Sequence, residues 1–287
     1  MRTVLRADNF AFVRTFAAAL VLFAHQFELT GRPDEPVFLG VHSYGGLGVL
    51  IFFSLSGFLV TKSWVSDPNV WRFALRRLLR IWPAYAVLIF LTVMVLGPML
   101  SALPPSGYYR NPWVIEYQKN LVFVMREGLP GVAFRGSALP TAVNGSLWTI
   151  PLELWCYVLL AAFGTIGLIR RGLVLAVLTL TLVLVHAGLP VRGEWFASAG
   201  LLPIHHLYFL EFGTFFLIGA CLQHFWPFVS ERLSHMAAGA AIVGMGAYLC
   251  GRPMLAAMIW VPFFTICVAS GSYPYPESVA SGARLIA

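Results

Sequence analysis

Apolar stretches long enough to cross a bilayer recur along the chain, and short polar connections separate them. Each stretch has roughly 17 to 23 residues, which at about 1.5 Å of helical rise per residue approaches the thickness of the hydrocarbon layer. The alternation typical of a membrane β-barrel is not visible. The pattern predicts an all-α fold, a polytopic transmembrane helical bundle of about eight spans. The predicted spans are Phe10–Leu29, Tyr44–Lys62, Ile81–Leu103, Leu147–Ile169, Gly172–Leu189, His206–Phe225, Met236–Cys250 and Met254–Ala269.

Composition and charge support the membrane class. Of the 287 residues, 59% are hydrophobic and 11% are charged, whereas soluble domains carry far more charge. The net charge of +7 is dispersed over the connections, which argues against a nucleic-acid partner. With the amino terminus in the cytoplasm, the basic clusters at residues 76–80 and 170–171 lie inside, as the positive-inside rule favours. The four cysteines show no CxxC or metal-ligand spacing, so we expect no disulfide and no metal site.

The first span carries two ionisable residues, Arg14 and His25, in an otherwise apolar sequence. They are eleven positions apart. At about 100° per residue they lie on nearly one helical face, separated by roughly 16 Å along the axis. An ionisable side chain in hydrocarbon is costly unless it faces a cavity or a partner, so both are functional candidates. Two structural alternatives exist: Arg14 can snorkel to the cytoplasmic interface, and His25 can hydrogen-bond a neighbouring helix.

A basic amphipathic stretch, Trp71–Pro83, leads from the second span into the third. Arg77 and Arg80 are three residues apart and therefore neighbours on one helical face. The planar donor group of arginine fits phosphate oxygens, which makes this face a candidate phosphate clamp. The alternative is an anchor on the membrane surface. The second span is punctuated by glycine and serine, from which we expect close helix packing.

Two carboxylates lie in the outer halves of later spans. Glu153 lies roughly two turns into the fourth span, and we expect His25 at a comparable depth. A histidine and a carboxylate at one depth can form a pair in which the carboxylate orients the imidazole and stabilises its charged form. Glu211, near His205 and His206, is either a second functional carboxylate or a structural hydrogen-bond partner for a neighbouring helix.

The longest non-spanning segment, Pro104 to Ser146, is rich in proline, glycine and aromatic residues. On the predicted topology it lies outside the membrane, where a polymeric acceptor can approach. The alternative is a passive connection. No internal repeat of the kind found in inverted-repeat transporters stands out.

Four of these features together resemble the acyltransferase family 3 membrane proteins, which O-acylate bacterial surface polysaccharides and related glycans. Arg14 and His25 are similar to the family's Arg-x10-His, and residues 48–59 to its glycine- and phenylalanine-rich second span. Residues 77–83 resemble its Arg-x-x-Arg-x-x-Pro motif, and residues 146–153 its Ser-Leu-Trp followed by a carboxylate. The motifs occur in the family's order, whereas the later spans resemble the family by hydropathy alone.

The resemblance implies acetyl-CoA, or another acyl-CoA, as a co-substrate bound from the cytoplasm, and an acceptor hydroxyl on a glycan or lipid-linked saccharide at the outer face. Arg14, Arg77 and Arg80 then bind the CoA phosphates. His25, about 16 Å further out, meets the thioester at the end of the extended pantetheine arm, as a general base or as a transient acyl carrier. Glu153 is its expected catalytic partner. The implied location is the bacterial cytoplasmic (inner) membrane.

Family members usually continue with further spans and a Ser-Tyr-Gly-like segment. Residues 273–287 show no spanning pattern, so we expect a single domain over residues 1–287 that lacks the last spans of the family. Two other functions are alternatives: a transporter that moves an acyl group or an anionic solute along the same polar track, and an inactive truncated membrane partner.

Overall fold

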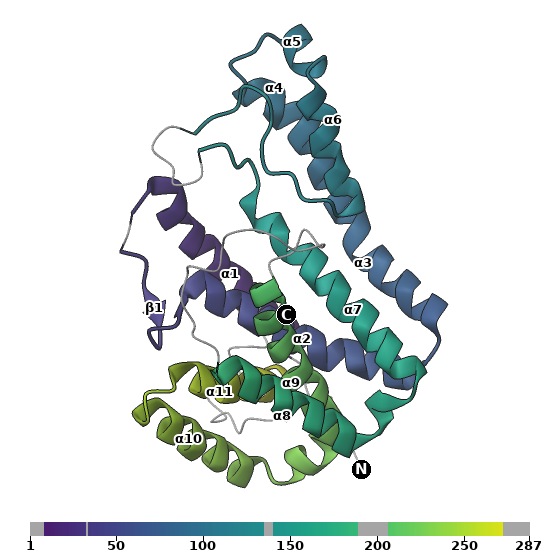
Figure 1. Cartoon of the computed structure of the whole chain (residues 1–287), viewed down its shortest axis with the longest axis vertical. Coiled ribbons are helices and arrows are strands. Elements are labelled where there is room, and N and C mark those ends of the chain that lie inside the picture. The colour runs from purple at the N-terminus through teal and green to yellow at the C-terminus, as the bar shows by residue number, and fades with distance from the viewer. Residues whose placement is uncertain (1–8, 33, 135–139, 189–205, 272–287) are drawn as a thin grey trace, which may run out of the picture.

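The computed structural model describes residues 9–32, 34–134, 140–188 and 206–271 of the chain (Figure 1). These residues are mostly helical, which confirms the predicted all-α fold. The predicted non-spanning tail, residues 273–287, lies outside the described residues. The long helices are α1 (Phe10–Thr30), α2 (Tyr44–Ser66), α3 (Val70–Leu91), α7 (Thr149–Thr165), α8 (Gly172–Gly188), α9 (His206–Glu231), α10 (Leu233–Leu249) and α11 (Pro253–Ala269).

The third span begins earlier than the apolar pattern predicts. Helix α3 starts at Val70 and continues through a π-helical turn, Thr92–Leu96, into α4 (Gly97–Leu100). The side chain of Asn69 caps the helix by accepting a hydrogen bond from the backbone N–H of Arg72, which satisfies one of the free donors of the first turn. The basic stretch that leads into the third span is therefore part of the same helix.

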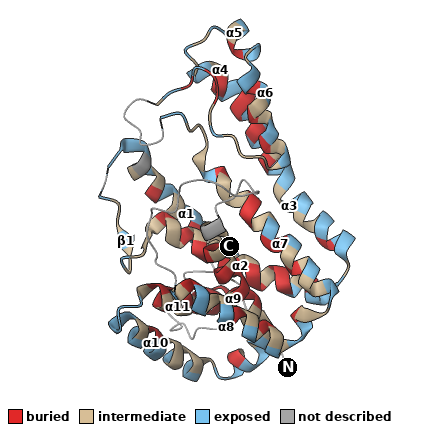
Figure 2. Ribbon diagram, in the orientation of Figure 1, coloured by how far each residue is buried: buried red, intermediate tan, exposed pale blue. Residues whose placement is uncertain are grey.

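The helices have the length and the surface of membrane spans. In the described part of the chain, five are long and apolar enough to cross a membrane: Phe10–Phe27, Tyr44–Ser66, Val70–Leu100, Gly145–Thr165 and Tyr208–Glu231. Helices α8, α10 and α11 are also apolar, with 17 residues each, about 25 Å of helix. Buried residues gather on α2 and α9, and exposed residues lie on the outward faces (Figure 2). The exposed residues include many large apolar side chains. Such a surface suits lipid, as expected of an integral membrane protein.

Two ends of the bundle are distinguished by close contacts. The backbone N–H of Asn9 donates to the carbonyl oxygen of Ala269 (2.8 Å), so α1 starts where α11 ends; we call this end the amino-terminal face. Between α1 and α2, an antiparallel hairpin of β1 (Val37–Phe38) and β2 (His42–Ser43) turns the chain back; we call that end the hairpin face. Which face meets the cytoplasm stays a prediction.

Helix α2 lies at the centre of the core, between α1 and α9. A Cβ atom added to Gly57 would lie 1.9 Å from the backbone oxygen of Phe216, so the two backbones touch. Side chains such as Leu50 and Phe215 are fully buried around this contact. The predicted role of the small residues in the second span, close helix packing, is thus confirmed.

The described residues of the predicted non-spanning segment contain short helices, of which α5 (Pro105–Tyr109) and α6 (Pro112–Gln118) lie beside the far end of α3 (Figure 1). The others are η2 (Lys119–Val122) and η3 (Gly145–Trp148). The buried hydroxyl of Tyr108 donates to the backbone oxygen of Val93 (3.0 Å), which fastens the segment to the helix. The segment is a packed cap on α3, and η3 leads directly into α7.

Candidate active site

The packing of α1 against α2 sets the depth of the candidate side chains on the first helix. A Cβ atom added to Gly45 would lie 2.6 Å from the Cβ atom of Ala24, so His25 lies at the level of the first turn of α2. Because α1 is one unbroken helix, Arg14 lies roughly 16 Å closer to the amino-terminal face. The two residues therefore mark two separate levels of the bundle.

Two hydroxyl groups hold the carboxylate of Glu153 at the level closer to the amino-terminal face, that of Arg14. Ser56 of α2 donates to it (2.6 Å), and so does Tyr157, which lies one turn further along α7. Ser56 is eleven residues after Gly45, about 16 Å along α2. His25 and Glu153 therefore lie at different depths, contrary to the expectation, and Glu153 does not orient His25. The register between helices, which the local sequence does not encode, determines these depths.

Arg14 of α1 and Arg77 of α3 lie near this carboxylate, and Arg80 of α3 lies near both of these arginines. Arg14 interacts electrostatically with both other arginines and with Glu153. The guanidinium group of Arg77 lies 6.0 Å from the centre of the Tyr157 ring. In the described residues none of the three arginines forms an ion pair. We call these arginines and Glu153 the arginine cluster; its excess of positive charge suits a multiply charged anion.

Two other arginines on α3 are already paired. Arg72 and Arg76 lie 2.6 and 2.8 Å from the carboxylate oxygens of Asp67, in the turn before the helix. Their hydrogen bonds lower the pKa of Asp67 to about 2, and the hydrogen bond from Arg72 makes the largest contribution. Paired arginines of this kind stabilise the turn, and they provide an internal comparison for the unpaired arginines of the cluster.

The imidazole of His25 is oriented by its own helix. Its Nδ1 atom lies 2.8 Å from the backbone oxygen of Val21. Because a carbonyl oxygen only accepts hydrogen bonds, Nδ1 carries the hydrogen, and in the neutral ring Nε2 is then unprotonated. No partner for Nε2 occurs among the described residues. A backbone carbonyl thus takes the orienting role that the sequence suggested for Glu153, and Nε2 is left to accept a proton.

A second group of ionisable side chains lies at the hairpin face. The Nε2 atom of His42 contacts the carboxylate of Glu211, and the two side chains are 15% and 11% exposed. His186, near the end of α8, interacts electrostatically with both. We call these three residues the histidine cluster. Glu211 therefore contacts an imidazole that the hairpin supplies from far away in the sequence. His205 and the side chain of His206 lie outside the described residues.

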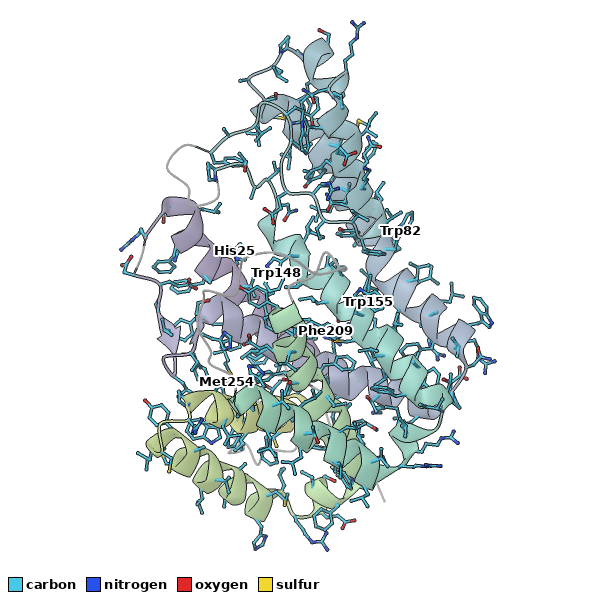
Figure 3. The ribbon with its side chains drawn as sticks, in the orientation of Figure 1. His25, Trp82, Trp148, Trp155, Phe209 and Met254 are labelled. Carbon is cyan, nitrogen blue, oxygen red and sulfur yellow. The ribbon has the colours of Figure 1, made fainter. Side chains whose placement is uncertain are left out.

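Aromatic side chains pack beside the histidine cluster. The ring of Trp148, in η3, lies 4.8 Å from that of Tyr208 and 5.6 Å from that of Phe212, which follows Glu211 on α9. His25 and Trp148 project close to one another near the centre of the bundle in Figure 3. This end of the bundle thus combines imidazole, carboxylate and aromatic groups.

Four residues in or beside these clusters are not singled out by the sequence: Tyr157, Ser56, His42 and His186. Tyr157 follows Glu153 by four residues, the spacing at which side chains on a helix meet, and that spacing was a usable signal. Ser56 is one of the small residues from which the sequence predicts only close helix packing. His42 lies in a connection with no carboxylate near it in sequence, and only the fold brings it to Glu211. His186 is an ionisable residue within the fifth predicted span, the same signal that marks Arg14 and His25, but only the fold brings it to Glu211 and His42.

Comparison with known proteins points to one family. A family model described as an acyltransferase domain, that of the acyltransferase 3 family, matches residues 8–282. The matched range contains every residue of the arginine and histidine clusters as well as His25. No solved structure is detectably similar to the chain.

Curated relatives share about half of the chain. An O-acetyl transferase from Shigella phage Sf6 is 33% identical over 154 residues, 54% of this chain and 45% of the relative. Nodulation protein 10 of Rhizobium leguminosarum bv. viciae is 31% identical over 160 residues, 53% of this chain and 43% of the relative. A regulator of hypoxia-inducible factor 1 from Caenorhabditis elegans is 28% identical over 159 residues, 51% of this chain and 29% of the relative. The chain thus spans less than half the length of each relative.

Proposed function

Because the chain belongs to the acyltransferase 3 family, we propose that it is a membrane-bound O-acyltransferase of a bacterial inner membrane. It transfers an acyl group, in the first instance acetyl, from acyl-CoA to a hydroxyl of a surface polysaccharide or a glycolipid precursor. The printed name of the phage relative, O-acetyl transferase, agrees with an acetyl group and an oxygen acceptor. The observation that carries the proposal is the separation between an unpaired arginine cluster and an imidazole with a free Nε2 atom.

The arginine cluster is the proposed binding site for the CoA phosphates. Arg14, Arg77 and Arg80 present guanidinium donors that no carboxylate pairs in the described residues, and arginine binds phosphate through two parallel hydrogen bonds. Glu153, held by Ser56 and Tyr157, offsets part of the positive charge of Arg14 and Arg77 and so allows the guanidinium groups to lie close to one another. We therefore assign Glu153 a positioning role.

The chemical step takes place at the level of His25, roughly 16 Å from Arg14. The Nε2 atom accepts the proton of the acceptor hydroxyl while its oxygen attacks the thioester carbonyl. The carbon–sulfur bond then breaks, and His25 returns the proton to the CoA thiolate, so that an ester and CoA leave with no net release of protons. A general base of this kind typically contributes about 10² to 10⁴ in rate.

The test supplies radiolabelled acetyl-CoA to detergent-permeabilised membranes that contain the protein, with lipopolysaccharide and octyl glycosides as acceptor probes. The wild type is expected to label an acceptor, and His25→Ala to reduce labelling by about 10² or more. His235→Ala is the matched control, because His235 is exposed on α10. Equal labelling by wild type and His25→Ala contradicts the catalytic assignment, and absence of labelling by the wild type contradicts the proposed function.

A further inference from the structure

We infer that the histidine cluster, His42, Glu211 and His186, is a binding site for the hydroxyl groups of the acceptor. This inference rests on the proposed function and assigns it a second binding site, separate from the arginine cluster. The ligand class is a saccharide unit: neutral, rich in hydroxyl groups, and with an apolar ring face.

The first reason is the free-energy cost of burying ionisable side chains in an apolar bundle. His186 and Glu211 are 6% and 8% exposed, and ionisable groups at such burial in an apolar bundle persist only with partners. The Nε2 atom of His42 contacts the carboxylate of Glu211, whereas the buried Nδ1 atom of His186 has no hydrogen-bond partner in the described residues. A hydroxyl group, which both donates and accepts, suits this unpartnered nitrogen and the carboxylate lone pairs that His42 does not use.

The second reason is the depth of the cluster. His42 lies two residues before the start of α2, and the first turn of α2 is level with His25, because Gly45 lies against Ala24. An acceptor bound here presents a hydroxyl at the level of His25 and not at the level of the arginines. The carboxylate of Glu35 also reaches this turn: its Oε1 atom is buried without a hydrogen-bond partner, 4.0 Å from the Cβ position of Gly45.

The third reason is the backbone that carries His42. The turn of the hairpin places Leu39 at φ +53°, a left-handed conformation that leucine rarely adopts. Such conformations persist where the surrounding structure fixes them and are frequent at ligand sites. The turn holds His42 of β2 against Glu211 of α9, so the strained conformation serves to place one imidazole.

The fourth reason is the aromatic wall next to Glu211. Trp148 and Tyr208 lie with their ring centres 4.8 Å apart, and Tyr208 stacks on Phe212 at 5.9 Å. Aromatic rings combine a large apolar surface with a polar tip in Tyr and Trp. Beside carboxylate and imidazole groups they provide the two kinds of contact, apolar and hydrogen-bonding, that a sugar ring requires.

The experiment measures acceptor binding and acceptor kinetics separately. Saturation-transfer NMR records binding of octyl glucoside, galactoside, mannoside and rhamnoside to the purified full chain. Steady-state kinetics at saturating acetyl-CoA then use the glycoside that binds best. Glu211→Gln and His42→Gln keep the size of each side chain, and Glu231→Gln, an exposed residue of the same helix α9, is the matched control.

We expect both cluster variants to lose glycoside binding and to raise the KM for the acceptor about tenfold or more, as for a lost hydrogen bond to a charged group. The KM for acetyl-CoA and the affinity for CoA stay within about twofold of wild type. Glycoside binding that is absent in the wild type or unchanged in both variants overturns the inference. So does a fall in kcat and thermal stability with an unchanged acceptor KM, which identifies the cluster as a structural latch. A wild type that binds glycosides but transfers no acetyl group contradicts the proposed reaction instead, so the two failures are distinguishable.

Discussion

The two levels of the bundle satisfy their charges in different ways. At the arginine cluster three cations share one nearby carboxylate, and none of them forms an ion pair with another described residue. At the histidine cluster the carboxylate of Glu211 contacts an imidazole directly. An excess of fixed positive charge in a poorly hydrated site suits an anion such as phosphate. A balanced set of donors and acceptors suits a neutral hydroxyl compound. The difference suggests that the chain separates its donor and acceptor sites by depth, with His25 on the acceptor side.

The largest effect on stability is expected at the backbone contact between α2 and α9, because both helices carry residues of the two clusters or their partners. Gly57→Val places side-chain atoms where the backbone oxygen of Phe216 now lies, 1.9 Å from the Cβ position, and forces α2 away from α9. We expect a loss of about 3 kcal/mol or more and little folded protein. Fluorescence-detected size exclusion and thermal unfolding measure this. Gly246→Val is the control, since its Cβ position meets nothing within 4 Å; equal yields and melting temperatures contradict the packing account.

The next effect separates the unpaired from the paired arginines. Arg77→Gln and Arg80→Gln each remove a donor proposed for CoA phosphate, so we expect the KM for acetyl-CoA to rise about tenfold to a hundredfold with the acceptor KM unchanged. Arg72→Gln, which removes a partner of Asp67, is expected to change the donor KM less than about twofold. Two-substrate kinetics on the three variants measure both constants. Similar shifts in all three would remove the distinction.

A smaller effect is expected at Tyr157, whose hydroxyl helps to hold the negatively charged carboxylate of Glu153. Tyr157→Phe deletes one of the two hydroxyls that donate to Glu153 but keeps the ring beside Arg77. We expect the donor KM to rise by about threefold to tenfold, in line with one lost hydrogen bond, with an unchanged acceptor KM. Tyr248→Phe, a partly exposed tyrosine of α10, serves as the control. An effect on the acceptor KM alone contradicts the positioning role of Glu153.

The smallest effect is expected at the exposed ion pairs before α3. The pKa of Asp67 is lowered to about 2, mainly by the hydrogen bond from Arg72. Its contribution to stability is therefore complete above the usual carboxyl pKa and is lost as the pH falls through about 2. Asp67→Asn is expected to flatten the acid limb of a plot of melting temperature against pH, with little change at neutral pH. An equally steep acid limb in the variant contradicts this prediction.

The sequence predicts the helices far better than it predicts their register. The bounds of α1 and α8 agree with the apolar pattern to within one residue. A helix that crosses a bilayer needs a long run of apolar residues, and such a run is easily recognised in the sequence. The depth of Glu153 was misplaced because it depends on contacts between helices, such as Ser56 with Glu153 and Gly45 with Ala24. Those contacts join residues far apart in the chain, and no local pattern encodes them.

The features of the candidate site also fall into those that local sequence predicts and those that depend on contacts between distant residues. The common face of Arg14 and His25 follows from helical geometry, and the spacing of Arg77 and Arg80 follows from it as well. The pairing of His42 with Glu211 joins a hairpin to α9, and only the three-dimensional structure reveals it. Intramembrane charge identifies the functional candidates, and packing decides which of them act together.

The central claim is that the donor binds at one level of the bundle and the acyl group is transferred at another. The most direct test measures donor binding and acyl transfer separately in one variant. CoA affinity and single-turnover transfer from bound acetyl-CoA are measured for the wild type and His25→Gln. If the arginine cluster binds the donor and His25 acts only at the acceptor level, the variant binds CoA with the wild-type Kd while its transfer rate falls by about 10² to 10⁴. A variant that loses CoA binding, or one that transfers at the wild-type rate, contradicts this account.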